Sequence, residues 1–515
     1  MTASVAIRVD SGVHIGGGHL YRCLTLAEEL RERGADVCFV SREHPGHLLD
    51  RLAGSGYRVL RLPAPRTDAS RSADGHAWLG VGQDEDAAET LAALGGTEVD
   101  WLVVDHYGID AEWERRVRGL ARHVMVIDDL ADRPHDASLL LDQNYFGTDT
   151  AVRYEQRVAN GCRRLLGPRY ALLQAGYRQL RRSLPPRSGT VGRILVFFGM
   201  NDPTRAASRV LEALSNPDFS RIALDVVVGS DAALLAEVRS LAGSRAGVTV
   251  HEQLSSLADL TASADLAIGG CGATTWERAC LGVPALVATI ADNQVALAHA
   301  LAAEGFAVLV GRSERTASSI WRIVIRQLLK DPGRLAALGN RMRGLTDGHG
   351  AGRVARVMLG GDSPVVVRRC SAADEPLLLE WANDPETRRF AFNRSRIADD
   401  EHHRWFCARL EDPSYAILIG EDSHGLPLGQ VRFDLYRDTS EATINISVDV
   451  ALRGTRIGGV LLREAVAVWR KSHPDIRIIA EVVAGNEASR RLFSSAGFAV
   501  TASRRPETIT FESLQ

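Results

Sequence analysis

The chain is poor in the features that mark disulfide-linked, metal-binding and membrane-spanning proteins. Its 515 residues include only seven cysteines, which are scattered and show no C-x-x-C spacing. This argues against a disulfide framework or a zinc site and favours a reducing compartment. No apolar stretch approaches the length of a membrane span, and the first residues form a strand pattern rather than a basic segment followed by an apolar run. We therefore expect a cytoplasmic protein that has no membrane partner and no metal.

An excess of charge of either sign is also lacking. The 61 Lys and Arg residues nearly balance the 64 Asp and Glu residues, and the net charge of -3 predicts no binding to nucleic acid or to an anionic membrane. The hydrophobic share of 45% is ordinary for a globular protein. The length exceeds that of a single core, so two or three domains are expected. No internal repeat or low-complexity tract is present, and nothing indicates an oligomeric state.

The rhythm of the chain divides it into three parts. In residues 1–182 and 190–359, strand patterns alternate with helical patterns, which predicts two α/β lobes, each with a parallel sheet. Turn-rich stretches at 183–189 and 360–364 separate these lobes from residues 365–515, where consecutive strands joined by short loops predict a mixed α+β domain. The strand candidates are Val5–Val9, Asp36–Val40, Trp101–Val104, His123–Ile127, Arg193–Phe198, Ala223–Val228, Asp265–Ile268, Pro284–Ala288, Val365–Arg368, Tyr415–Ile419, Leu428–Tyr436, Ala442–Val450 and Ile476–Val483.

A glycine-rich turn that ends in a histidine is the most informative motif. Gly16, Gly17, Gly18 and His19 follow the first strand and begin an amphipathic helix. Backbone amides at a helix N-terminus attract phosphate, and glycines let the phosphate approach closely. The histidine adds a titratable group beside the anion. From the residues alone, a histidine that hydrogen-bonds the helix backbone is an equally simple interpretation.

A second glycine-rich turn lies in the second lobe, at 267–278, and it also opens a helix. Glu277 has two interpretations there. With Thr274 it forms a capping-box pattern, in which the glutamate accepts from backbone amides. Alternatively, its carboxylate accepts hydrogen bonds from ribose hydroxyls, as acidic residues do in dinucleotide-binding folds. The sequence leaves both open.

Many short motifs, in order, resemble the UDP-sugar hydrolases of pseudaminic acid biosynthesis, over nearly all of residues 1–350. These enzymes have a two-lobed, glycosyltransferase-B-like fold and cleave UDP-2,4-diacetamido-2,4,6-trideoxy-β-L-altropyranose to UDP and free sugar. The matching segments are Arg8–Asp10, Ile15–His19, Arg22–Leu24, Val104–Ile109, Ile127–Ala131, Leu141–Asn144, Leu166–Leu173, Phe198–Pro203, Thr274–Arg278 and Asp292–Gln294.

The resemblance implies a role for individual residues. His19 falls on the family's catalytic base, which activates water while UDP leaves. The nucleotide is expected mainly against the second lobe. The residues implied to bind the UDP-sugar are Gly16, Gly17, Gly18, His106, Tyr107, Asn201, Gly272, Thr274, Thr275, Glu277, Asn293 and Gln294. No metal is implied.

The last domain carries a further strand–turn–helix motif, and here the sequence resembles the GNAT N-acetyltransferases. Their Arg/Gln-x-x-Gly-x-Gly/Ala signature is similar to residues 453–458, although Arg456 stands at the position of the first glycine. The start of the domain, around 380–386, is similar to the subgroup that acetylates amino sugars. The implied acetyl-CoA-binding residues are Val450, Arg453, Gly454, Arg456, Gly458, Gly459 and Asn486.

The proton donor for the leaving thiol is not assigned by this resemblance. Many relatives have a tyrosine where this chain has Phe493, and Glu481, His402 and His403 are open candidates. Pseudaminic acid biosynthesis places an acetyl transfer to a UDP-4-amino sugar directly before the hydrolysis. The two resemblances together therefore predict a bifunctional enzyme with a UDP-amino-sugar substrate and acetyl-CoA as co-substrate. A fused glycosyltransferase, the same chemistry on another 4-amino-6-deoxy sugar, and a non-catalytic UDP-sugar-binding scaffold stay as alternatives.

Overall fold

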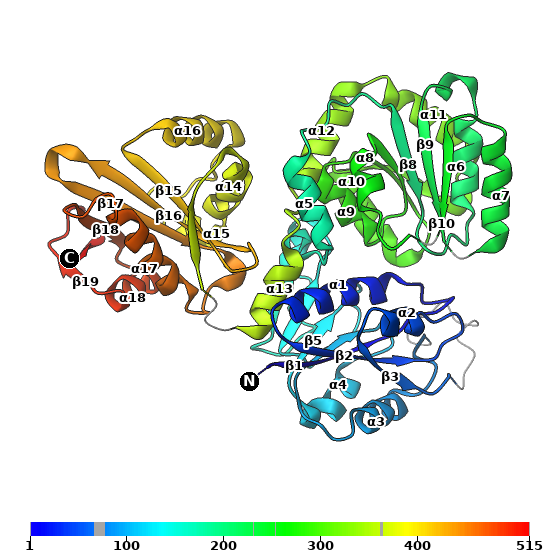
Figure 1. Cartoon of the computed structure of the whole chain (residues 1–515), viewed down its shortest axis with the longest axis horizontal. Helices are drawn as coiled ribbons and strands as arrows, with labels where there is room; N and C mark the ends of the chain where they lie inside the picture. The colour runs from blue at the N-terminus through cyan, green and yellow to red at the C-terminus, as the bar shows by residue number, and fades with distance from the viewer. Residues whose placement is uncertain (1, 66–77, 230, 253, 361–363, 514–515) are drawn as a thin grey trace. The chain divides into compact units, whose positions relative to one another are not determined.

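The chain forms two compact units, Met1–Ala355 and Arg356–Gln515, each described separately below (Figure 1). The structure is a computed structural model that describes residues 2–65, 78–229, 231–252, 254–360 and 364–513. The predicted turn at 360–364 includes Gly361–Ser363, which lie outside the described residues.

The first unit contains two parallel sheets. In the described residues the first sheet has the strand order β3-β2-β1-β4-β5-β6-β7, in which the order reverses between β1 and β4. Its strands are β1 (Ser4–Val9), β2 (Asp36–Arg42), β3 (Arg58–Leu62), β4 (Val99–Asp105), β5 (Ala121–Ile127), β6 (Leu139–Asp142) and β7 (Arg163–Leu166). Its helices are α1 (Gly18–Glu32), α2 (Leu49–Gly54), α3 (Gln83–Leu94) and α4 (Ala111–Val117).

The second sheet repeats this plan with the order β10-β9-β8-β11-β12-β13, and its order reverses between β8 and β11. Its strands are β8 (Arg193–Phe197), β9 (Ala223–Val228), β10 (Val248–Glu252), β11 (Leu266–Gly269), β12 (Ala285–Thr289) and β13 (Val308–Arg312). The helices that follow β7 are α5 (Ala175–Ser183), α6 (Ala206–Leu214), α7 (Ala232–Gly243), α8 (Ala258–Ser263), α9 (Thr274–Leu281), α10 (Val295–Ala303), α11 (Ser318–Leu329), α12 (Pro332–Arg343) and α13 (Gly350–Leu359).

The apolar runs of these strands follow from burial on both faces of the sheet. In β8, Ile194 and Val196 belong to one core, whereas Leu195 and Phe197 belong to the core on the opposite face. The second of these cores also contains Tyr177 of α5, so α5 packs on the second lobe, against α8 and α9. Because ligands of such folds bind at the carboxyl ends of the strands where the order reverses, the two reversals mark where a site is expected.

The second unit has a mixed sheet with the order β14-β15-β16-β17-β18-β20-β19, in which only the β17–β18 pair is parallel among the described strands. The strands are β14 (Val366–Arg369), β15 (Tyr415–Glu421), β16 (Pro427–Tyr436), β17 (Glu441–Val448), β18 (Arg477–Val483), β19 (Phe498–Thr501) and β20 (Thr508–Ser513). The helices are α14 (Glu375–Asn383), α15 (Pro385–Arg389), α16 (Asp399–Glu411), α17 (Ile457–Arg470) and α18 (Glu487–Ser495). The predicted fold class, two Rossmann-like lobes followed by an α+β domain, is confirmed.

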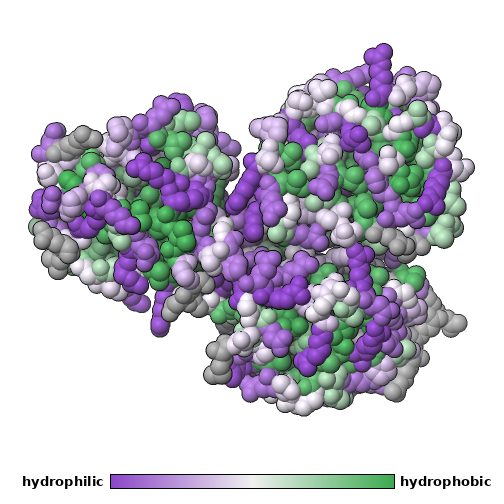
Figure 2. All heavy atoms as spheres, in the orientation of Figure 1, coloured by the Kyte–Doolittle hydropathy of each residue, from purple (hydrophilic) through white to green (hydrophobic). Residues whose placement is uncertain are grey.

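Within the described ranges, no helix has both the length and the apolar character needed to cross a membrane. On the face shown in Figure 2, hydrophilic residues (purple) interrupt the hydrophobic residues (green) throughout.

One glycine is required by close packing of two strands, and this can be tested. A Cβ atom at Gly269 would lie 2.1 Å from the carbonyl oxygen of Phe197 in β8, and backbone cannot move aside cheaply. We expect Gly269→Ala to lower the free energy of unfolding by about 1–3 kcal/mol. The control is Gly176→Ala in α5, where nothing lies within 4 Å and a gain of about 0.5 kcal/mol is expected. Urea denaturation of the two variants checks this, and equal stabilities would contradict it.

Candidate functional site

The glycine turn between β1 and α1 is built as the sequence predicts. Gly16 has a φ of +79°, a backbone conformation that favours glycine, and its N–H donates to the carbonyl of Gly12 at 2.8 Å. Gly17 is the N-cap of α1, and a Cβ there would meet the Tyr21 ring at 3.1 Å. Gly18 has nothing within 4 Å of its missing Cβ. The backbone conformation therefore favours glycine at Gly16, the close Tyr21 ring favours it at Gly17, and neither constraint applies at Gly18.

His19, the second residue of α1, contacts a carboxylate at the end of β4. Its Nδ1 lies 2.6 Å from Oδ1 of Asp105, whose side chain is fully buried. The His19 side chain keeps 11% of its surface exposed, and its ring meets the Tyr107 ring edge-on at 4.6 Å between centroids. Because a carboxylate can only accept, Nδ1 is the donor in this contact, and in the neutral ring Nε2 is then the nitrogen with the free lone pair. The alternative of a histidine that merely caps backbone does not describe this contact.

Arg22, one turn further along α1, completes the anchoring of this carboxylate. It donates from Nε to Asp105 Oδ2 and from Nη2 to Oδ1, both at 2.7 Å, and from Nη1 to Asp129 Oδ2 at 2.7 Å. Burial alone would raise the pKa of Asp105, but the positive charge of Arg22 and the His19 ring outweigh it and hold that pKa well below its ordinary value. Asp105 is therefore a permanent anion beneath His19.

Tyr107 connects this cluster to the second lobe. Its hydroxyl donates to Asp129 Oδ2 at 2.9 Å, and the amide of Asn293, which follows β12, approaches the same hydroxyl at 3.4 Å. On its other side the Tyr107 ring stacks on Trp78 at 5.6 Å between centroids. Tyr107 thus contacts His19 and Trp78 in the first lobe and Asn293 in the second lobe. A substrate contact was predicted at Tyr107.

His106, although adjacent in sequence, is turned into the interior. Its Nδ1 accepts from the Gly108 N–H at 2.9 Å, and its Nε2 lies 3.4 Å from Asp10 within a buried cluster around the Arg8–Asp10 ion pair. The side chain is 2% exposed, and burial lowers its pKa. This position supports packing beneath the glycine turn rather than the predicted contact with substrate, and we leave His106 out of the site proposed below.

On the second lobe, the structure contradicts the capping-box interpretation of Glu277. The helix α9 begins at Thr274 with Ala273 as N-cap, and no side-chain cap is formed at this start. Instead the Glu277 carboxylate accepts from the Tyr177 hydroxyl at 2.7 Å. Burial raises the pKa of Glu277. The carboxylate is consequently fixed by α5 while the start of α9 is left without a side-chain cap.

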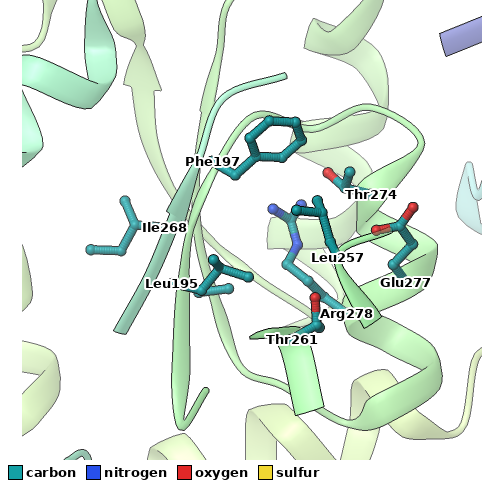
Figure 3. Close-up of a pocket in the computed structure, with 9 residues that line it drawn as sticks. Leu195, Phe197, Leu257, Thr261, Ile268, Thr274, Glu277 and Arg278 are labelled. Atoms are coloured by element: carbon teal, nitrogen blue, oxygen red, sulfur yellow. The ribbon is translucent and has the colours of Figure 1, made fainter. Parts of the chain in front are cut away.

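A pocket beside α9 includes Thr274 and Glu277, and Figure 3 shows both around it together with Phe197, Leu257 and Arg278. Arg278 donates to the Gly270 carbonyl at 2.8 Å and to the Thr275 hydroxyl at 3.1 Å. Thr275 is 1% exposed. Its hydroxyl therefore braces the loop, and its N–H donates to the Gly272 carbonyl at 2.9 Å, so neither group is free for the predicted nucleotide contact.

Three predicted amides hold the loops around this region. Gln294 Oε1 accepts from the N–H groups of Cys271 and Ile290, both at 3.2 Å, so it holds the Gly270–Gly272 loop. Asn201 donates to the carbonyl of Val13 in the first lobe at 2.7 Å. Asn293 likewise contacts the first lobe, at the Tyr107 hydroxyl, and the binding of a UDP-sugar by these three amides stays a prediction. Among the described residues, no group of three His, Cys, Asp or Glu side chains is placed to hold a metal ion.

The second unit has a separate candidate site, where β17 and β18 diverge. The two strands pair only through Glu441, Ala442 and Thr443, after which they separate. The chain then passes through a short helical turn, Val450–Leu452, to the start of α17. A Cβ at Gly458 would meet Val448 at 3.2 Å and Leu492 at 3.5 Å, so these two side chains pack close to the glycine beside the place where the strands separate. Gly454 has a φ of +78°.

Arg453, Asn486 and Arg456, which were predicted to bind acetyl-CoA, differ in their contacts within the domain. Arg453 forms an ion pair with Asp384 at 2.7 Å, so its guanidinium is already engaged. Asn486 caps α18 by accepting from the Ser489 N–H at 3.1 Å. Arg456 is the N-cap of α17 and has a φ of +65°. It therefore adopts the left-handed conformation of the glycine that it replaces, and it keeps the turn at an energetic cost.

None of the candidate proton donors is placed as a clear acid. Phe493, which stands where many relatives have a tyrosine, has no proton to donate. It is 3% exposed and packs on the Phe498 and Phe511 rings. His402 is 3% exposed, and burial lowers its pKa. His403 is held by Glu375 at 2.9 Å, and Glu481 by Arg505 at 3.0 Å. The assignment thus stays open.

Comparison with known proteins decides the class of the second unit. Residues 365–499 match the model of the acetyltransferase (GNAT) domain. The C-terminal unit is a GNAT acetyltransferase domain. It follows the two Rossmann-like lobes of the first unit.

Three relatives match all or part of this chain. An uncharacterized protein of Methanocaldococcus jannaschii is 22% identical over 99% of both chains. The spore coat polysaccharide biosynthesis protein SpsG of Bacillus subtilis is 23% identical over 69% of this chain and 97% of its own length. The UDP-2,4-diacetamido-2,4,6-trideoxy-β-L-altropyranose hydrolase of Campylobacter jejuni is 27% identical over 34% of this chain and 53% of its own.

Several residues of the first site were not singled out from the sequence. Asp105 and Asp129 lay inside the quoted motifs. Asp105 ends β4, which lies at the reversal of the sheet, and Asp129 follows the neighbouring strand β5. That placement was a usable signal. Trp78 and Tyr177 carried none, since their proximity to Tyr107 and Glu277 arises from tertiary packing.

The left-handed backbone of Arg456 gives a prediction for the GNAT domain. We expect Arg456→Gly to raise the free energy of unfolding by up to about 1 kcal/mol through relief of backbone strain. We also expect it to raise the KM for acetyl-CoA, because a cation leaves the turn. Glu507→Gly is the control, since Glu507 also has a positive φ of 60° and lies outside this turn. Thermal unfolding and thiol-release kinetics measure both effects. An unchanged KM would remove Arg456 from the binding residues.

Proposed function

We propose that the chain is a bifunctional nucleotide-sugar enzyme of pseudaminic acid (nonulosonic acid) biosynthesis. Its GNAT domain transfers acetyl from acetyl-CoA to the 4-amino group of a UDP-4-amino-4,6-dideoxy-AltNAc-type sugar. Its two-lobed unit then hydrolyses the UDP-2,4-diacetamido-2,4,6-trideoxy sugar to UDP and free sugar. Similarity to the Campylobacter jejuni hydrolase over part of the first unit supports the second step.

One observation carries the hydrolytic half, namely the contact of His19 Nδ1 with the buried Asp105 carboxylate beside the glycine turn. A histidine whose Nδ1 is held by a carboxylate offers Nε2 as a base. The ring is partly exposed, and it meets the ring of Tyr107, which in turn stacks on Trp78. These features fit activation of water next to a sugar.

The proposed hydrolysis needs a base, a positioned water molecule and stabilisation of the diphosphate. His19 Nε2 takes a proton from water as the water oxygen bonds to the anomeric carbon. The bond from that carbon to the diphosphate oxygen breaks, and its electron pair leaves with UDP. UDP is a good leaving group, so the protein mainly positions water and stabilises the diphosphate. We assign the diphosphate to the amides around Gly18 and Gly272, and the ribose to Glu277 at the start of α9.

In the acetyl transfer, the sugar amine attacks the thioester carbonyl, the carbon–sulfur bond breaks, and the thiolate leaves with a proton. We assign acetyl-CoA to the place where β17 and β18 separate, beside Gly458 at the start of α17. Gly459, at the start of α17, and Val450, after β17, lie along the same turn. Backbone near Ser447 would polarise the carbonyl.

The two activities can be separated with one substrate. The UDP-4-amino sugar is supplied with acetyl-CoA, and thiol release and UDP release are measured independently. We expect His19→Asn to abolish UDP release while thiol release continues at the wild-type rate. Gly458→Leu should stop thiol release but leave UDP release intact when the diacetylated substrate is supplied. Loss of both activities in either variant, or of neither, would refute the assignment of two sites.

The same experiment tests the main alternative. A fused glycosyltransferase would transfer the sugar to an acceptor and release no free sugar, whereas a binding scaffold would bind UDP without turnover. We expect free sugar to appear in an amount equal to that of UDP.

Asp105 is proposed as a positioning residue for His19. We expect Asp105→Asn to lower the kcat of UDP release by about 10²- to 10⁴-fold, since Nδ1 loses its anionic acceptor, and to change the KM little. Asp105→Glu should recover part of the kcat. Ser208→Ala, a buried polar substitution in α6, controls for general destabilisation. A fall in kcat that merely follows the loss of folded protein, by circular dichroism, would rule out a positioning role.

A further inference from the structure

The sheet of the GNAT domain has two faces with different tasks. Gly420, Gly429 and Val448 are paired across neighbouring strands and therefore share one face. Gly420 and Gly429 would each meet Leu461 of α17 if they carried a Cβ, so this face is the one covered by α17. It carries the opening assigned to acetyl-CoA. The opposite face packs against α14 and α16, through Ile417 and Ile419.

Arg432 lies on this opposite face, because it is paired with Ile417 in β15 and with Asn445 in β17. Its guanidinium lies over the Trp405 ring at 5.4 Å and donates to Asn445 Oδ1 at 2.8 Å. Trp405 comes from α16. The guanidinium thus lies between the Trp405 ring of α16 and the Asn445 side chain of β17.

A second arginine approaches from α15. Arg388 donates to the carbonyl of Asn393 at 3.1 Å, and its charge is close enough to Arg432 for the two to repel each other. Burial and this neighbouring positive charge lower the pKa of Arg388. A bound anion would relieve the repulsion between these two guanidinium groups.

No carboxylate of the described residues forms an ion pair with either arginine, although most arginines nearby have one. Arg453 is paired with Asp384, Arg389 with Glu386, and Arg368 with Asp374. By contrast, the Nε atoms of Arg388 and Arg432 are buried and have no hydrogen-bond partner among the residues that are described. The anion that would complete the pair is therefore external to this part of the chain.

A third group on the same face is also unsatisfied. Gln430, two residues before Arg432 in β16, is 2% exposed, and its Oε1 has no hydrogen-bond partner within the described residues. An acceptor oxygen beside two cations suits a ligand that has both anionic oxygens and a donor group, such as a hydroxyl or an amine.

We propose that Arg388 and Arg432 form the site that holds the diphosphate of the acetyl acceptor in the GNAT domain. The acceptor is then a nucleotide-linked amino sugar, held by its phosphates on the α14–α16 face, while acetyl-CoA occupies the α17 face. This inference rests on the proposed acetyl transfer and specifies its acceptor. It also sets an order, because a sugar that has lost its nucleotide has lost the group that these arginines bind.

Acetyl-transfer kinetics test the assignment. We expect Arg388→Gln and Arg432→Gln each to raise the KM for the UDP-4-amino sugar by about 10- to 100-fold, with the KM for acetyl-CoA unchanged. Arg404→Gln is the matched control, since it removes the same charge from exposed α16, where Arg404 contacts only Asp400 at 3.4 Å among described carboxylates. A raised KM for acetyl-CoA would instead assign the pair to coenzyme A. Unchanged KM values for both substrates would overturn the proposal.

A binding measurement keeps the test independent of the sugar. Inorganic pyrophosphate is titrated by equilibrium dialysis against the full chain at saturating coenzyme A, and the wild type is compared with the double variant Arg388→Gln/Arg432→Gln. We expect one binding site to be lost in the double variant and none in Arg404→Gln. If the wild type acetylates no UDP-amino sugar but this loss is observed, the proposed function fails and the anion site stands. If pyrophosphate binding is the same in all three proteins, the anion site itself is refuted.

Discussion

The first unit depends on one buried carboxylate. Asp105 ends β4 and receives Arg22 and His19 from α1. A buried anion without partners would be very costly, and removal of one partner from such a pair typically costs about 3–5 kcal/mol. The pair therefore fixes the rotation of α1 against the sheet. The glycine turn and His19 lie at the start of that helix, so the same interaction that orders α1 also aims the histidine.

The cluster extends from this carboxylate to the second lobe through a short series of contacts. Arg22 reaches Asp129, Asp129 accepts from the Tyr107 hydroxyl, and Asn293 approaches the same hydroxyl. Asn201 adds a second contact, to Val13 beside the glycine turn. A change in the separation of the lobes would break the contacts of Asn293 and Asn201 first. The polar groups that surround His19 would thus differ between an open and a closed state of the two lobes.

Much of this could be predicted from the sequence, and the remainder has a physical cause. The strands of the parallel sheets are nearly continuous apolar runs, and eight of them were predicted to within two residues, as at β9, Ala223–Val228. The strands β3, β6, β7, β10 and β13 were not among the predicted ones. The glycine turns were visible because few other residues adopt their conformation. Side-chain direction was not visible. His106 and Tyr107 are neighbours on the chain, yet one turns into the Asp10 cluster and the other toward His19. Glu277 fitted a capping box by spacing, but Tyr177 from a distant helix binds it.

As proposed, the two units recognise phosphate by different means, and this difference bears on the order of reactions. In the proposed hydrolysis, the first unit would bind the diphosphate through the backbone of its glycine turns and helix starts. The GNAT domain, as proposed, offers two guanidinium groups that have no carboxylate partner within the described residues. These can grip a nucleotide sugar that must leave with its diphosphate intact. Acetylation therefore has to precede hydrolysis. Joining the two steps in one chain raises the effective concentration of the acetylated product for His19 without any new contact.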